Sequence, residues 1–96
     1  MGEEGAQVKV HLPGSLAREF GVKPLVPARG RTLQEAIHSL AKLSAGLDAC
    51  VLDDGGKVRR HVIVFVNKDA VTHMDPSTVT LRDGDEVHVL PHVAGG

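Results

Sequence analysis

Hydrophobic and polar residues alternate along three stretches of this chain, and such alternation is typical of strands that bury one face. The three stretches are residues 6–12, 58–66 and 86–90. In the first and last of them, the residues that we expect to face the core are Val8, Val10, Leu12, Val87 and Val89. The pattern therefore predicts three strands, each with one buried and one exposed face.

The stretch 58–66 is the strongest strand candidate, because strict alternation is combined with β-branched residues on one side. Its even-numbered positions include four valines, Val58, Val62, Val64 and Val66. The other side begins and ends with polar residues, Arg59 and Asn67. We therefore expect the valine side to face the core, which leaves Ile63 and Phe65 pointing outward.

The segment from Thr32 to Gly46 carries the signals of one amphipathic helix. Thr32 and Glu35 form a capping box, in which Thr32 accepts a bond from the N3 amide and Glu35 reaches back to the Thr32 N–H. Apolar residues then recur at helical spacing, at Leu33, Ala36, Ile37, Leu40 and Ala41. Gly46 supplies a left-handed stop, so we predict a helix from Leu33 to Ala45.

The connecting segments complete the fold class. Pro24 and Pro27 restrict the stretch 23–28 to a sheet edge, because proline cannot donate to a strand ladder. The stretch 70–73 is consistent with a short strand that pairs back after a turn at 67–69. Two further segments carry no decisive pattern, residues 16–21 and 47–52. Together the elements predict an α+β fold, with one main helix packed across one face of a sheet.

Composition narrows the classes of partner. The chain has 96 residues, which fits one domain. Its 11 basic and 12 acidic residues are mixed along the chain and give a net charge of −1, so no basic stripe for a phosphate backbone is present. Two phenylalanines without tyrosine or tryptophan offer few stacking platforms for single-stranded nucleic acid. We therefore expect no nucleic-acid partner.

The sequence also indicates a compartment. The single cysteine, Cys50, excludes an intramolecular disulfide and suits a reducing environment. No apolar run approaches the ~20 residues of a transmembrane helix, and the first residues lack the apolar core of a signal peptide. We expect a cytoplasmic protein without a membrane partner.

The candidate chemical residues do not form a catalytic or metal-binding pattern in the sequence. His88 and His92 have the H-x-x-x-H spacing, but that spacing places two ligands together only on a helix. We interpret Cys50 as a small hydrophobic residue. Four aspartates lie beside turn glycines, Asp53, Asp54, Asp83 and Asp85, and turn chemistry accounts for them. The prediction is no catalytic residue and no metal site.

The end of the chain carries the strongest functional signal. Pro91 is expected to end the strand 86–90, because it has no N–H and a fixed φ. We therefore divide the chain into a domain over residues 1–91 and an extended tail over residues 92–96. Gly95 and Gly96 carry no side chains, so the tail narrows to backbone that can enter a tunnel. The reactive group is the α-carboxylate of Gly96.

The segment around this tail resembles a known family. The turn Asp83-Gly84-Asp85, the strand that follows and the ending Pro-x-Val-Ala-Gly-Gly resemble the ubiquitin-like sulfur carriers of the MoaD/ThiS group, including the related cysteine-biosynthesis carriers. Val-Asn-x-x-x-Val at Val66–Val71 and Leu-x-Asp-Gly-Asp-x-Val at Leu81–Val87 are further landmarks. The resemblance implies the β-grasp fold of ubiquitin, a mixed sheet with its first and last strands parallel at the centre.

That arrangement would place several side chains on the uncovered face of the sheet. By the resemblance, the side chains that line up there are Lys9, His11, Ile63, Phe65, His88 and Leu90. A half-apolar open face is a candidate docking surface. We predict that Ile63, Phe65, His88 and Leu90 form the partner-binding face.

The resemblance also implies a mechanism. A separate activating enzyme would adenylate Gly96 with ATP and magnesium, and a sulfur donor would then displace AMP to leave a thiocarboxylate. Gly95 and Ala94 would clear the partner's tunnel, and Val93 would anchor the tail. The partners would be the activating enzyme and a sulfur-acceptor enzyme. This chain would bind no cofactor and act as a carrier, or as a small non-catalytic subunit such as that of molybdopterin synthase.

Two alternatives keep the fold and change the function. A ubiquitin-like modifier would use the same adenylated Gly96 to form an isopeptide bond with a lysine. A β-grasp binding module would carry an incidental tail. The receiving pathway also stays open among molybdopterin, cysteine, thiamin and thiolated tRNA.

Overall fold

The computed structural model describes residues 5–91, which form one five-stranded sheet with the helix α2 (Leu33–His38) packed across one face. The elements in chain order are β1 (Ala6–His11), α1 (Gly14–Phe20), β2 (Leu25–Gly30), α2 (Leu33–His38), η1 (Ser39–Lys42), η2 (Asp48–Cys50), β3 (Val62–Val66), β4 (Asp69–Ala70), η3 (Pro76–Thr78) and β5 (Glu86–Pro91). None of the helices found between residues 5 and 91 is both long and apolar enough to cross a membrane.

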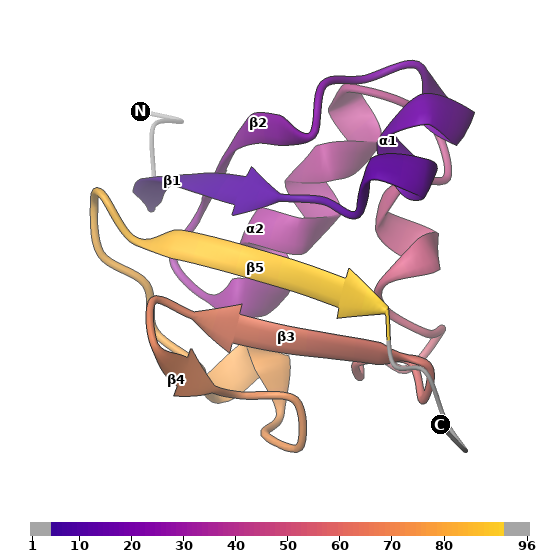
Figure 1. Ribbon diagram of the computed structural model, residues 1–96. Helices are drawn as coiled ribbons and strands as arrows, with labels where there is room; N and C mark the ends of the chain where they lie inside the picture. The colour runs from indigo at the N-terminus through magenta and orange to yellow at the C-terminus, as the bar shows by residue number, and fades with distance from the viewer. Residues whose placement is uncertain (1–4, 92–96) are drawn as a thin grey trace.

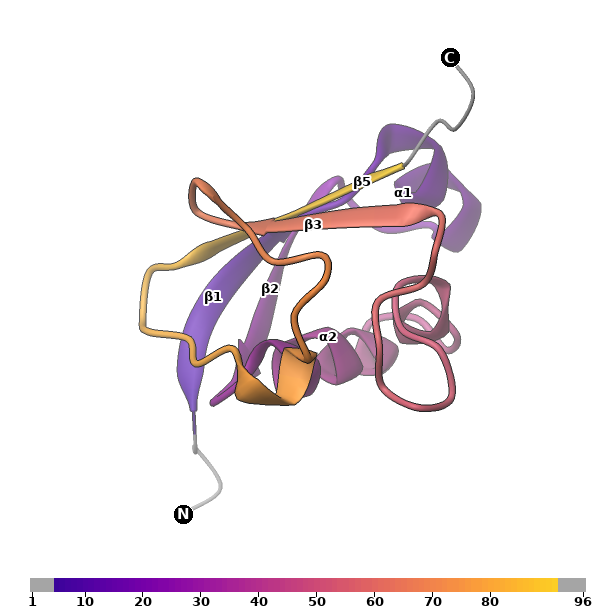
Figure 2. The ribbon, with the colours of Figure 1, turned by 90° about the horizontal axis from the view of Figure 1, so that it is seen from below.

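The sheet has the strand order β2-β1-β5-β3-β4 (Figure 1). β1 and β5 run parallel at its centre, whereas the other neighbouring strands run antiparallel. α2 crosses one face and leaves the other face uncovered (Figure 2). The predicted α+β class and the mixed sheet are therefore confirmed.

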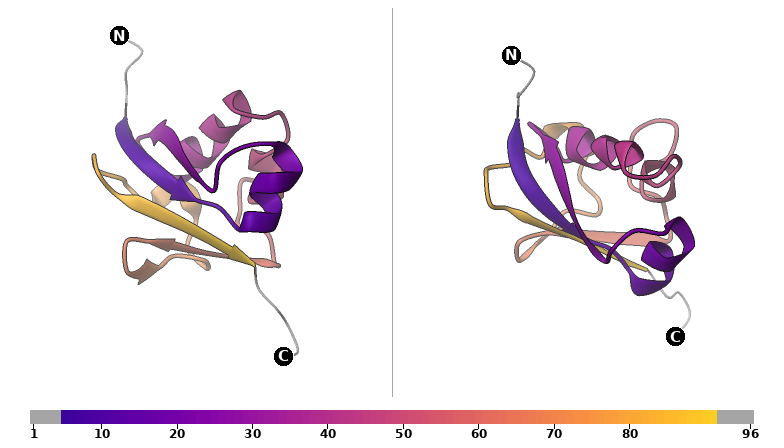
Figure 3. Two further views of the ribbon diagram at one scale, coloured as in Figure 1. Left: turned by 45° about the horizontal axis from the view of Figure 1, so that its top comes forward. Right: turned by 90° about the horizontal axis from the view of Figure 1, so that it is seen from above.

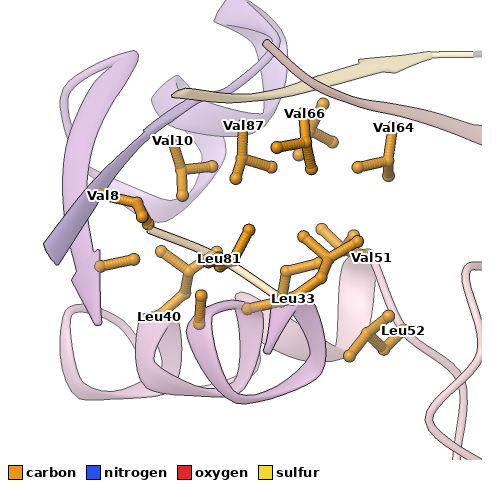
Figure 4. Packing of buried hydrophobic residues seen from close by; sticks show 14 of the residues in the cluster. Val8, Val10, Leu33, Leu40, Val51, Leu52, Val64, Val66, Leu81 and Val87 are labelled. Atoms are coloured by element: carbon orange, nitrogen blue, oxygen red, sulfur yellow. The ribbon is translucent and has the colours of Figure 1, made fainter. Parts of the chain in front are cut away.

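The core lies between α2 and the inner face of the sheet (Figure 4). Val10, Val64 and Val87 from the three central strands are fully buried, as are Leu33 and Leu40 below them. Among the described residues, no polar or charged residue is buried. The predicted inward orientation of the valine side is confirmed, and burial of this apolar surface is the main stabilising term.

The start of α2 agrees with the predicted capping box in part. The Glu35 N–H donates to Oγ1 of Thr32 at 3.2 Å, as expected. The reciprocal bond differs from the prediction, because the Glu35 carboxylate accepts from the N–H of Arg31 at 2.8 Å and not from that of Thr32. The Glu35 carboxylate thus accepts from the residue that precedes the N-cap residue Thr32.

The end of the helix also differs from the prediction. The α-helix ends at His38 and continues only as the 3₁₀ turn η1, whereas we expected helix to Ala45. Ser39 explains the change, because its hydroxyl donates to the Ala36 carbonyl at 2.6 Å and accepts from the Arg29 N–H at 3.2 Å. The bond from Arg29 connects the helix to β2, and the local sequence does not predict this bond.

The boundaries of β3 and β5 differ from the prediction. β3 begins at Val62 and not at Val58, because Val58 bridges to Leu52 and the Arg59 N–H donates to the Val51 carbonyl. β5 includes Pro91, which pairs with Val62 as the last residue of the strand. A proline is tolerated there because the ladder needs no further donor beyond the strand end.

The structure also assigns the segments for which the sequence pattern was not decisive, and it corrects the bounds of β2 and of the short strand after β3. Residues 16–21 lie in α1 and its left-handed cap Gly21, and residues 47–52 contain η2. β2 lies at the sheet edge as predicted, but spans 25–30 and not 23–28. The short strand after β3 is β4 at 69–70 and not 70–73, because Asn67 with φ of 56° makes a tighter turn.

Candidate functional site

The uncovered face of the sheet presents one row of side chains across its strands. The register places His11 beside His88 and His88 beside Phe65, while Leu25 of β2 pairs with His11 at the edge. His88 and Phe65 are half-buried, and Leu25 is 46% exposed. The row is therefore apolar at both ends and imidazole in the middle.

A second cross-strand pair lies closer to the end of β5. Ile63 of β3 pairs with Leu90 of β5, and Leu90 is 45% exposed. The next pair along the same two strands is Val62 with Pro91, where the described part of the chain ends. The open face therefore leads directly to the point from which residues 92–96 continue.

Four of the predicted partner-binding residues thus share one face, Ile63, Phe65, His88 and Leu90. Their outward orientation follows from the same alternation that buries the valines between them. Leu25 lies on the same face, although we did not predict it as a partner-binding residue. The signal was present, since Leu25 alternates with the buried Val26. A role of these residues in docking stays a prediction.

The predicted tail residues lie outside the described residues. These are Val93, Ala94, Gly95 and Gly96, together with His92. What the structure fixes is the origin of the tail, because Pro91 is paired to β3 at the end of a central strand. The origin of the tail therefore lies beside Val62, at the end of the open face that carries Ile63 and Leu90.

Polar groups gather beside the row at the start of β5. Nε2 of His11 lies 2.7 Å from Oε1 of Glu86, and the rings of His11 and His88 stack with centroids 4.2 Å apart. The Glu86 N–H donates to the Asn67 side-chain carbonyl at 3.0 Å. Asn67 in turn donates to Asp85, and this bond lowers the pKa of the Asp85 carboxyl.

Asp53 and Asp83 perform the turn roles predicted for them. Oδ1 of Asp53 accepts from the N–H groups of Gly55 and Lys57, at 2.9 and 3.0 Å. Oδ1 of Asp83 accepts from the Gln7 N–H at 2.8 Å and ties the turn to β1. These carboxylates are occupied by backbone donors, which agrees with a structural function.

Cys50 is partly buried near the end of β5. Burial raises the pKa of its thiol, Glu19 and Asp48 raise that pKa further, and Arg59 opposes the shift. A raised pKa keeps the sulfur protonated at neutral pH, and the thiol form is not nucleophilic. The raised pKa disfavours the nucleophilic thiolate, and the interpretation of Cys50 as a small hydrophobic residue stays a prediction.

Two of the grooves on the described surface adjoin β5. The larger, of about 770 Å³, has a mixed-charge lining that includes Lys9, Lys42 and Asp83, and it lies near the start of β5. The smaller, of about 460 Å³, is lined by Leu16, Cys50, His61, Leu90 and Pro91. We give the smaller groove more weight, because it adjoins the origin of the tail. Sequence reasoning did not find it, since its walls come from distant segments.

Comparison with known proteins gives one consistent result. A model of the ThiS family matches residues 10–96. The sulfur carrier protein CysO of Mycobacterium tuberculosis is 34% identical over 91 residues, which cover 93% of this chain and 98% of that protein. Small archaeal modifier protein 3 of Haloferax volcanii is 40% identical over 65 residues, which cover 68% and 70% of the two chains. A chain in the crystal structure of the BexX/CysO complex of Amycolatopsis orientalis superposes with a TM-score of 0.80 at 32% identity, covering 93% of this chain and 99% of that chain.

Proposed function

Since this chain belongs to the ThiS family of ubiquitin-like sulfur carriers, we propose that it carries sulfur as a thiocarboxylate on Gly96. The observation that supports this most directly is the extent of the family match, which runs through the tail to residue 96. The pairing of Pro91 with Val62 at the end of a central strand supports a tail that begins at residue 92. The chain is a carrier in this proposal, and the catalysis belongs to its partners.

The carboxylate needs activation before it can accept sulfur. An α-carboxyl group has a pKa of about 3.5 and is ionised at pH 7, so a nucleophile does not attack it. A carboxylate oxygen of Gly96 would attack the α-phosphorus of ATP and release pyrophosphate. A sulfur donor would then attack the acyl carbon, and AMP would leave with the electrons of the broken C–O bond. ATP and magnesium act in the activating enzyme.

The tail residues have separate roles in this proposal. Gly95 and Ala94 have no bulky side chain, so they fit a narrow tunnel in the partner. Val93 is the first larger apolar residue before them and would anchor the tail at the tunnel entrance. The thiocarboxylate sulfur would then be delivered inside a sulfur-acceptor enzyme, without release into solution.

The open face supplies the docking surface in the same proposal. Phe65, Ile63 and Leu90 offer apolar contact, and His88 lies beside Phe65 on β5, two residues before Leu90. Because Leu90 directly precedes Pro91, a partner seated on this face would lie close to the origin of the tail. The BexX/CysO complex shows that a CysO-type carrier assembles with another protein, which supports docking of this kind.

A mass measurement tests the proposal. The full chain, incubated with an adenylating enzyme of the ubiquitin-like carrier class, Mg-ATP and sulfide, should gain the mass difference between sulfur and oxygen at Gly96. Cys50→Ser serves as the background, so that a thiol-selective alkylator reports only the new sulfur. Addition of one residue after Gly96 should abolish the reaction, because the electrophilic carbon would be displaced from the activating site.

The control separates the tail from the domain. Deletion of Gly95 and Gly96 should abolish the mass gain and leave the melting temperature almost unchanged, because β5 ends its pairing at Pro91. A loss of more than about 1 kcal/mol in the free energy of unfolding would show that the tail packs on the domain, against the proposal of a free tail.

The second candidate function is protein modification. The 40% identity to small archaeal modifier protein 3 over 65 residues favours it. In that case Gly96 would appear in isopeptide linkage to lysines of other proteins, and its mass would not show the sulfur exchange. If neither product forms, the β-grasp binding module is the function that remains.

A further inference from the structure

Three side chains with metal-ligating atoms meet on the open face at the junction of β1 and β5. The ligand atoms of His11, Glu86 and His88 all lie within 4.8 Å of one another. Two imidazoles and one carboxylate form the donor set of a three-ligand zinc site, in which the fourth position is open. The H-x-x-x-H spacing in the sequence suggested a different histidine pair and gave no hint of this group.

The central strands hold the backbone of these three residues in place. Parallel pairing sets His11 beside His88, and Glu86 lies two residues before His88, on the same face of β5. Asn67 binds both backbone polar groups of Glu86: the Asn67 N–H donates to the Glu86 carbonyl at 2.7 Å, and the Asn67 side-chain oxygen accepts from the Glu86 N–H. The ligand positions are therefore preorganised by the sheet rather than by a flexible loop.

We propose that His11, Glu86 and His88 bind one divalent transition-metal ion of the zinc class. Imidazole nitrogen suits zinc, copper and nickel, whereas calcium and magnesium prefer all-oxygen sites. The two rings stack at an interplanar angle of 14°, so one must tilt before both nitrogens point at one ion. His11 and Glu86 have the freedom to adjust, with side chains 37% and 48% exposed.

The site goes beyond the proposed function, because sulfur transfer through Gly96 needs no metal on the carrier. The ion would sit in the same row as Phe65 and would bind His88, which is itself one of the proposed docking residues. Its open coordination position would face solvent, or a donor atom of a protein seated on this face. Failure of the metal proposal would leave the sulfur-carrier proposal unaffected, because the two are measured at different atoms.

Titration with zinc alone tests the proposal. In the Cys50→Ser background, which removes the thiol as a competing ligand, we expect one zinc per chain by calorimetry. In imidazole nitrogen NMR spectra, the ring resonances of His11 and His88 should shift at one equivalent, while those of His73 should not. His11→Gln, His88→Gln and Glu86→Gln should each lower the affinity at least about tenfold, the lower end of the loss seen for second-shell changes.

Two histidines serve as matched controls. His73→Gln changes an exposed histidine away from the group, and His92→Gln removes the partner that the sequence spacing would have chosen. Both variants should bind zinc as the parent does, and thermal melts should confirm that all five variants remain folded. The proposal is overturned if either control loses as much affinity as His88→Gln. It is equally overturned if the resonances of His11 and His88 stay unmoved, or if no zinc binds.

Discussion

The two faces of the central strands are built from alternate residues of the same segments, yet they differ in chemistry. Figure 3 shows that α2 lies on one side of the sheet. On β3, Val64 is fully buried in the core, whereas its neighbour Phe65 is half-buried on the open side. On β5, the buried Val87 and the half-exposed His88 show the same contrast. Strand periodicity thus separates two functions at single-residue resolution: one face stabilises the domain, and the other is available for recognition.

The largest effect is expected from a charge placed on the covered face. Val64→Asp would bury a carboxylate without a partner in an entirely apolar core, which is strongly unfavourable. We expect a loss of more than about 4 kcal/mol in the free energy of unfolding, enough to unfold a small domain. Far-UV circular dichroism would show the loss directly. If Val64→Asp folds normally, the covered face is not the part of the sheet that stabilises the domain.

A steric change beneath the covered face should have the next largest effect. A Cβ on Gly30 would overlap the backbone nitrogen of Ala36, because β2 and α2 approach closely there. We expect Gly30→Ala to cost about 1–3 kcal/mol, measured by urea denaturation. Gly14→Ala is the matched control, since no atom lies within 4 Å of the added carbon and the backbone is helical. Equal losses in both variants would contradict the close approach.

An aspartate on the open face should reduce stability less than the aspartate at Val64. Phe65→Asp places the charge at the surface, one residue from Val64, and we expect a cost of about 1 kcal/mol or less. Affinity for the activating or acceptor enzyme should fall at least tenfold, measured by surface plasmon resonance. Unfolding of Phe65→Asp would reverse the assignment of the two faces.

The smallest effect is expected from a charge that lies on neither face. Hydrogen bonds from Ser77 and contact with Lys57 lower the pKa of Asp75 to about 2. The folded state therefore gains stability above the unfolded pKa, near pH 4, and loses it as the pH falls toward 2. The melting temperature of the wild type should exceed that of Asp75→Asn slightly at neutral pH, and the difference should vanish near pH 2. A difference independent of pH would exclude this carboxylate as its cause.

Much of this comparison could be predicted from the sequence, because alternation depends on local geometry alone. The inward valines of β3 and the start of α2 at Thr32 follow from patterns within a few residues. The end of α2 could not be predicted, since it depends on the bond between Arg29 and Ser39 across two elements. The pattern of residues 16–21 does not predict α1 either. A helix of seven residues is stabilised mainly by packing against the rest of the domain, which the local sequence does not show.

The same distinction between local pattern and tertiary contact applies to the candidate site. The outward orientation of Phe65 and Leu90 was predictable from period two, whereas the group of His11, Glu86 and His88 was not. It depends on which strands pair and in which register, and no short spacing in the sequence records that. The docking role of the open face and the chemistry of Gly96 stay predictions, which the experiments above address.

The position of β5 between β1 and β3 also has a consequence for how the chain folds. Hydrogen bonds from β1 to β5 and to the turn before it join residues 75 and 76 positions apart, as between His11 and Glu86 and between Gln7 and Asp83. Contacts of such separation slow folding, because a long loop must close before any of them forms. Until β5 inserts, β1 and β3 both expose unpaired edges, to which a strand of another chain can add. The yield of refolded monomer should therefore fall as the protein concentration during refolding rises.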